Sequence, residues 1–146
     1  MVYRLDKSTY YGGFILKGRD FFLDSKTYLD LYNLIIVTIN ELNIRDEQQL
    51  LNALKSNEKF LQLKLTEQDL YITLANSIDD GLVKGRYTLT TFGYVFVLRG
   101  LTSDGINYLK SINSNKIMSK IKKAIHEEGL PFTPNSISKI LGKILF

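Results

Sequence analysis

The stretch from Thr66 to Leu109 constrains the fold more than any other part of the chain. It begins with an amphipathic segment that runs from Thr66 to Gly81, continues with two β-rich segments, and ends with a second helical segment that starts at Thr102. Thr66 and Asp69 have capping-box spacing, and Gly81 suits the left-handed conformation that ends many helices. A helix, a β-hairpin and a helix in this order predict the second half of a winged helix-turn-helix domain.

The β-rich segments, Arg86–Thr91 and Tyr94–Leu98, predict a hairpin that turns at Phe92 and Gly93. Because Phe is a poor residue at positive φ, we expect a loop longer than two residues, with Gly93 in the special conformation. We expect Gly105 to let the following helix lie close against the sheet or the first helix.

Helical spacing of apolar residues predicts four further helices. They begin near Ser25, at Asp46, at Ser114 or Asn115, and at Thr133-Pro134. The apolar run at residues 60–65 could form a short strand or continue a turn. Residues 1–24 have a β-like character and predict a hairpin that turns at Gly18.

The predicted fold class is α+β: a mainly helical winged helix-turn-helix domain with an N-terminal β-hairpin extension and two C-terminal helices. The extension covers residues 1–24, the winged-helix domain covers 25–113, and residues 114–146 form a helical extension packed on the same domain. With 45% hydrophobic residues, the 146-residue chain can form a core.

Composition argues against an enzyme. The chain has no Cys and one His, which disfavours thiolate or His-based metal sites and a Ser-His-Asp triad. No Gly-rich phosphate loop is present. We therefore expect no catalytic residue, no metal site, no cofactor and no small-molecule substrate. The absence of Cys and of a long apolar run fits a cytoplasmic protein.

Four segments carry a resemblance to a known family: LTEQDLYITLANSIDDGLVKG, LTSDGINYLKSI, KIMSKIKKAI and FTPNSISKIL. Together they resemble uncharacterised winged-helix proteins of bacteriophages and prophages, the YjcQ-like kind. The resemblance covers residues 27–146 and does not include residues 1–24. It implies a mobile-element origin, a winged-helix domain, and a nucleic-acid-binding or regulatory role.

Charge is distributed unevenly along the chain. Residues 1–83 carry a net −3, whereas residues 84–146 carry +7, within an overall net charge of +4. A basic C-terminal half favours nucleic acid or an acidic protein surface as a partner, and a solvated helix surface explains it equally well. The segment from Glu67 to Asp80 has four acidic residues and no Lys or Arg, which argues against its insertion into a DNA groove.

The first functional hypothesis is a phage-type regulatory protein that binds DNA, with contacts led by the wing and the C-terminal lysines. Its candidate residues fall into three groups. They are Gln68, Thr73 and Asn76, expected to be exposed on the third helix; Lys84, Arg86 and Arg99 on the wing; and Lys116, Lys120 and Lys123 on the helix after Ser114.

The alternative is a non-catalytic protein-interaction module, as a homodimer or a binder of a host protein. Its surface would use exposed aromatic residues. These are Tyr10, Tyr11, Phe14, Phe21 and Phe22 in the N-terminal extension, and Phe92 and Tyr94 at the tip of the wing. The amphipathic last helix also suits membrane contact, but packing on the domain or on a second subunit explains its apolar stripe better.

Overall fold

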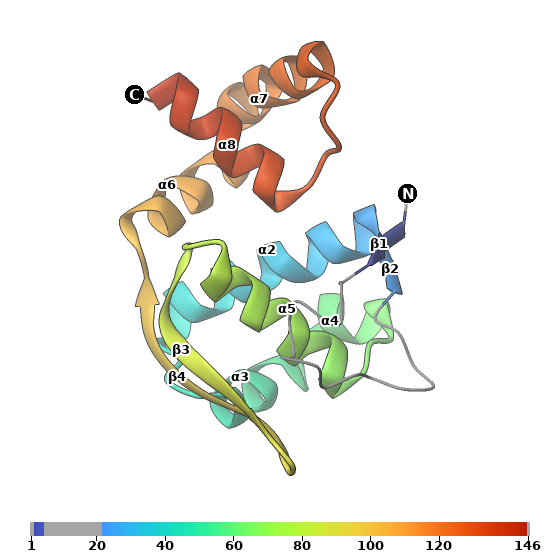
Figure 1. The fold of residues 1–146 in the computed structure, drawn as a ribbon, viewed down its shortest axis with the longest axis vertical. Helices are drawn as coiled ribbons and strands as arrows, with labels where there is room; N and C mark the ends of the chain where they lie inside the picture. The colour runs from blue at the N-terminus through green and yellow to red at the C-terminus, as the bar shows by residue number, and fades with distance from the viewer. Residues whose placement is uncertain (1, 5–21, 146) are drawn as a thin grey trace.

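The computed structural model describes residues 2–4 and 22–145, with side chains from residue 23 to residue 144 (Figure 1). The described part of the chain is α+β and mostly helical. Its elements are β1 (Val2–Arg4), β2 (Phe22–Asp24), α2 (Ser25–Leu42), α3 (Glu47–Leu54), α4 (Glu58–Leu63), α5 (Glu67–Asp79), β3 (Val83–Thr90), β4 (Gly93–Leu101), α6 (Ser103–Ile112), α7 (Asn115–Glu128) and α8 (Pro134–Leu145).

Helix α2 is the central helix of the core. The carboxylate of Asp24 caps its first turn by accepting from the backbone N–H of Thr27 at 2.8 Å, and Asn43 ends it in the left-handed conformation. Leu31, Tyr32, Ile35 and Ile36 are all 0% exposed. The helix packs against α5, α6 and β4, among other elements, so it is apolar on more than one side.

Strands β3 and β4 form an antiparallel hairpin whose two faces differ. Along β4 the buried positions alternate with exposed positions, as expected for a sheet with one face on the core. Tyr94, Phe96 and Leu98 point inward, and Tyr94 and Phe96 stack with ring centroids 5.5 Å apart. The outward face is open to solvent.

The turn of this hairpin is shorter than predicted. Thr90 pairs with Gly93, so two residues, Thr91 and Phe92, connect the strands. Neither of them has a positive φ, whereas Gly93 has φ 115°. The special conformation of Gly93 is therefore confirmed, and the expected longer loop is wrong because that one glycine absorbs the backbone change that closes the turn.

The sequence predicts a strand or a turn at residues 60–65, and both predictions are wrong. Glu58–Leu63 form the short helix α4, which Asn57 caps by accepting from the backbone N–H of Phe60 at 3.1 Å. The cap of Asn57 and the burial of Phe60 against the core favour a helical turn over a strand here.

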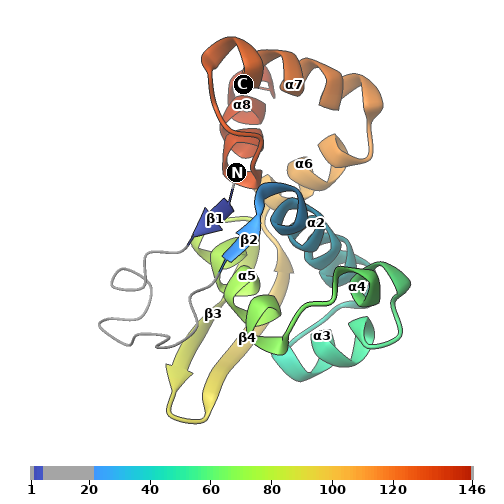
Figure 2. The same ribbon diagram turned by 90° about the vertical axis from the view of Figure 1, so that its right-hand side faces the viewer.

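The C-terminal helices form one end of the molecule, away from the tip of the hairpin (Figures 1 and 2). Helices α7 and α8 pack on each other and on α6. Gly105 in α6 lies against the start of β3, where a Cβ would overlap the carbonyl oxygen of Leu82. The predicted close approach of this helix is therefore confirmed.

Near the N-terminus, β2 pairs antiparallel with β1, with Tyr3 opposite Leu23. The predicted turn of this region at Gly18 lies outside the described residues.

Candidate nucleic-acid interface

Helix α5, which is the third helix of the predicted winged-helix domain, is buried on most of its circumference. Thr73 and Asn76 are 0% and 1% exposed, and Ser77 is also 0% exposed. The predicted exposure of Thr73 and Asn76 is wrong, because α2 and β3 pack against α5. Of the three candidate nucleic-acid-binding residues on this helix, Gln68 alone is partly exposed.

The polar side chains of α5 make hydrogen bonds inside the protein. The Thr73 hydroxyl donates to the carbonyl oxygen of Asp69 at 2.8 Å, and the Asn76 amide donates to the Tyr28 hydroxyl at 3.1 Å. Buried polar groups need such partners, since leaving one unpaired costs about 1–3 kcal/mol. Thr73 and Asn76 therefore serve the fold in this conformation and do not face a ligand.

The C-terminal end of α5 is joined to α2 through Asp80. The Tyr32 hydroxyl donates to the Asp80 carboxylate at 2.9 Å. Burial and the nearby Asp80 carboxylate raise the pKa of Tyr32 well above its ordinary value. Burial of the Asp80 carboxylate raises its pKa, although the residue as a whole is solvent-accessible. The hydrogen bond from Tyr32 lowers this pKa, and the nearby Asp79 carboxylate raises it further.

The hairpin brings the three predicted wing cations together. Lys84 and Arg86 on β3 and Arg99 on β4 are exposed on the outward face, and with Gly85 and Val97 they line a shallow recess of about 270 Å³. None of the ion pairs found within the described residues includes any of the three cations. The recess is therefore a concentrated and uncompensated positive surface.

The strand register explains this clustering. Arg86 pairs with Val97, and an irregularity between Val83 and Gly85 places Lys84 on the outward face near Arg99. Gly85 is required at this point because a Cβ would overlap the carbonyl oxygen of Val97. Like charges that face each other across a sheet destabilise it, so a bound anion would relieve their repulsion.

The body of the protein holds the hairpin firmly. On the inward face, the Tyr87 hydroxyl donates to the Asp79 carboxylate at 2.8 Å. Along β4, the backbone N–H of Leu98 donates to the carbonyl oxygen of Arg45 at 2.8 Å, and that of Phe96 donates to the Glu47 carboxylate at 3.2 Å. These hydrogen bonds fix the position of the two strands that carry the outward-facing cations.

The predicted lysines of α7 form a second basic surface. Lys116, Lys120 and Lys123 are exposed and follow helical spacing, so they lie along one face of α7. Lys122 is also exposed, and its ammonium lies 5.5 Å from the centroid of the Phe132 ring. In both views α7 lies at the opposite end of the molecule from the hairpin tip, so the two basic surfaces are separate (Figures 1 and 2).

The aromatic residues predicted as an interaction surface differ in how exposed they are. Phe92, at the hairpin tip, is 100% exposed. Tyr94 is 9% exposed and stacks on Phe96, so its predicted role at an exposed surface is wrong because strand alternation turns it inward. The remaining candidates have side chains outside the described residues: Tyr10, Tyr11, Phe14, Phe21 and Phe22.

Sequence reasoning missed the apolar part of the hairpin's outward face. Val95 and Val97 are 48% and 40% exposed. Their alternation with Tyr94, Phe96 and Leu98 is the signal that could have identified them, because period two puts one set outside when the other is buried.

No family model, curated protein or solved structure matches this chain. Over residues 2–4 and 22–145, no helix combines the length and the apolar character needed to cross a membrane. Within the same residues, no group of three or more His, Cys, Asp or Glu side chains could hold a metal ion.

Proposed function

We propose that this chain is a winged-helix protein of phage type that binds nucleic acid through the outward face of its β3–β4 hairpin. In this assignment α2, α3 and α5 are the three helices of the domain and the hairpin is the wing. The order of these elements and the position of α6 directly after the hairpin support it. Helix α4 is an addition between the second and third helices.

One observation carries the proposal: Lys84, Arg86 and Arg99 converge on one recess of the hairpin and have no carboxylate partner in the described part of the chain. Lysine and arginine neutralise phosphates, and these contacts give affinity without sequence information. The recess is shallow, so it suits a phosphate group on an extended backbone better than an enclosed small molecule.

The burial and charge of α5 determine how such binding would occur. The helix carries Glu67, Asp69 and Asp79, with Asp80 at its C-terminal cap, and no cation. Its polar side chains Thr73 and Asn76 are buried. The proposed contact is therefore wing-led and directed at the backbone, with little base readout.

The test is duplex binding at low salt, measured by fluorescence anisotropy with a labelled DNA of random sequence. The triple variant K84Q/R86Q/R99Q should lose at least about tenfold in affinity at ~50 mM salt, because three phosphate contacts are removed. A matched control, K26Q/K139Q/K143Q, removes the same charge from exposed lysines of α2 and α8. Equal losses in the two variants would show that net charge alone drives binding and would refute the proposal.

A second candidate function is protein interaction, and the exposed apolar residues of the hairpin favour it. Phe92, Val95 and Val97 are 100%, 48% and 40% exposed. Exposed apolar patches mark partner surfaces, although this one is small. Under this reading, F92S/V95T abolishes a salt-resistant self-association or partner complex, whereas K84Q/R86Q/R99Q leaves it intact. Analytical ultracentrifugation at low and high salt separates the two readings.

A further inference from the structure

The outward face of the β3–β4 hairpin carries apolar side chains next to its cations. Val95 and Val97 on β4 are 48% and 40% exposed, and Phe92 at the tip is 100% exposed. Val97 lies in the wall of the cationic recess, beside Arg86. Because Arg86 pairs with Val97 and Thr88 pairs with Val95, the apolar residues continue from the recess towards the tip. The cations and the apolar residues therefore form one continuous face.

The charge of this face calls for an anionic partner. Residues 81–103 contain Lys84, Arg86 and Arg99 and no Asp or Glu. None of the ion pairs found among the described side chains includes these cations. Charge complementarity therefore specifies an occupant that carries several negative charges and also has apolar surface.

The hairpin turn holds the Phe92 ring away from the body of the protein. The backbone N–H of Phe92 donates to the Thr90 hydroxyl at 3.1 Å, and this hydroxyl donates to the carbonyl oxygen of Gly93 at 2.8 Å. These hydrogen bonds brace the turn from within. Since the residue is fully exposed, no described side chain covers its ring. A planar ring held in this way is a surface on which a nucleobase can stack.

A single strand of nucleic acid offers both groups that this face can contact. In a duplex the base faces stack on one another and the phosphates and sugars form the outer surface, so the apolar residues would meet polar groups. A single strand can turn its bases towards apolar side chains while its phosphates contact cations. From Gly93 to Arg99 the face is about 20 Å long, at about 3.3 Å per residue. This length suits a few nucleotides.

We propose that the outward face of the hairpin binds single-stranded nucleic acid in preference to duplex. One base stacks on the Phe92 ring, the neighbouring bases contact Val95 and Val97, and the phosphates lie against the three cations of the recess. This inference rests on the proposed function and names the form of nucleic acid that the hairpin takes. Stacking tolerates every base, so it agrees with the small base readout expected from the buried helix α5.

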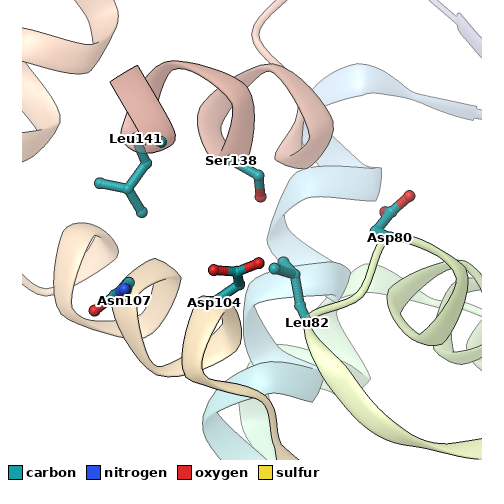
Figure 3. A pocket seen from close by; sticks show the side chains of 7 residues that line it. Asp80, Leu82, Asp104, Asn107, Ser138 and Leu141 are labelled. Carbon is teal, nitrogen blue, oxygen red and sulfur yellow. The ribbon is translucent and has the colours of Figure 1, made fainter. Parts of the chain in front are cut away.

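The other end of the hairpin borders a recess of opposite charge. This second recess, of about 290 Å³, lies between the C-terminal end of α5, helix α6 and helix α8 (Figure 3). Asp80 and Asp104 are in its wall together with Leu82 at the start of β3, and no Lys, Arg or His is among its lining residues. Its carboxylates repel phosphates, so this recess does not extend the nucleic-acid site.

A tryptophan at the tip tests the stacking directly. The chain contains no Trp, so F92W introduces a single indole whose emission is quenched when a base stacks on it. We expect saturating oligothymidylate or oligouridylate to quench F92W, and duplex DNA of the same length to leave its emission nearly unchanged. L61W is the matched control, because Leu61 is 56% exposed on α4, which lies away from the hairpin tip (Figure 2). Its emission should change with none of the three.

Fluorescence anisotropy with the same labelled oligonucleotides measures the affinities. F92A should lower the affinity for single strands by about fivefold or more, as expected for the loss of one stacked base, and should leave duplex affinity unchanged. At ~200 mM salt the unmodified chain should bind single strands more tightly than duplex, because salt weakens phosphate contacts more than stacking. The tighter of the two single strands identifies DNA or RNA as the ligand.

The outcomes separate this inference from the proposed function. If K84Q/R86Q/R99Q weakens binding and F92A does not, the hairpin binds nucleic acid without stacking, and the inference is overturned. An equal loss of single-strand and duplex affinity in F92A, or an unquenched F92W at saturation, would also overturn it. Loss of self-association in F92A with unchanged oligonucleotide affinity would assign the tip to protein contact instead. Absence of binding to every oligonucleotide would refute both proposals.

Discussion

Replacing Asn76 by alanine distinguishes a structural residue from a base-reading one. The side chain is 1% exposed and donates to the Tyr28 hydroxyl, on a residue that is 2% exposed. Loss of this hydrogen bond costs about 1 kcal/mol, and the vacated buried space adds a comparable amount. Asn76 Oδ1 has no partner among the described residues, so its removal offsets part of this cost.

We therefore expect N76A to lower the free energy of unfolding by about 1–2 kcal/mol, which corresponds to a melting temperature lower by about 3–6 °C. Guanidinium unfolding followed by circular dichroism measures the change. Q68A is the matched control, because Gln68 lies on the same helix and is partly exposed. It should change stability by less than about 0.5 kcal/mol.

Folded N76A should also bind duplex DNA as the unmodified chain does. A variant with unchanged stability and a lost DNA affinity would show that Asn76 reads bases, and it would refute the structural role given to α5.

Three further substitutions test the packing around the proposed sites. G105A should destabilise the fold by about 1–3 kcal/mol in thermal unfolding, because its Cβ overlaps the Leu82 carbonyl oxygen. T66A removes half of the capping box of α5 and should cost about 1 kcal/mol in denaturant unfolding. For Asp80, burial raises the pKa in the folded chain, so the folded state holds this proton more tightly than the unfolded state. Stability should therefore fall as pH rises above the ordinary carboxyl range, about 4, and D80N should lack this component of the decline.

Each of these expectations has a clear contrary result. A G105A chain as stable as the original would mean that α6 does not lie close against the start of β3. An unchanged T66A would show that the cap is not formed in solution. A carboxyl-carbon NMR titration that places the pKa of Asp80 at or below 3.8, the ordinary value, would remove the predicted pH dependence.

Local capping signals made most helix boundaries predictable. Asp46, Thr66, Thr102 and Ser114 each cap the helix that follows, as the sequence indicates. A cap depends on the hydrogen bond between one side chain and an amide two or three residues later, so nearby sequence is sufficient to identify it.

The surroundings of a helix are less accessible to sequence reasoning. In the sequence, the polar residues of α5 resemble an exposed helix face. In the structure α2 and β3 cover this helix, and Asn76 donates a hydrogen bond to Tyr28, 48 positions away in the sequence. The period-two pattern places Lys84 and Arg86 on one side of β3. Their proximity to Arg99 depends on the strand register and on the irregularity at Gly85, which local propensity does not specify.

The recess between α6 and α8 could not be predicted from sequence, because it depends on the packing of helices that start thirty residues apart. Asp80 and Asp104 are separately unremarkable acidic residues in the sequence. They line one recess only because the turn after α5 and the first turn of α6 lie side by side.

The salt dependence of duplex binding tests the central claim most directly. For each phosphate contact, the logarithm of the affinity falls by about 0.9 per logarithm of salt concentration. The three hairpin cations therefore predict a slope of about −2.7 or steeper. The R86Q substitution should make this slope shallower by about 0.9 and lower the affinity at every salt concentration. A slope and an affinity that are the same in R86Q and the unmodified chain would contradict nucleic-acid binding by the hairpin.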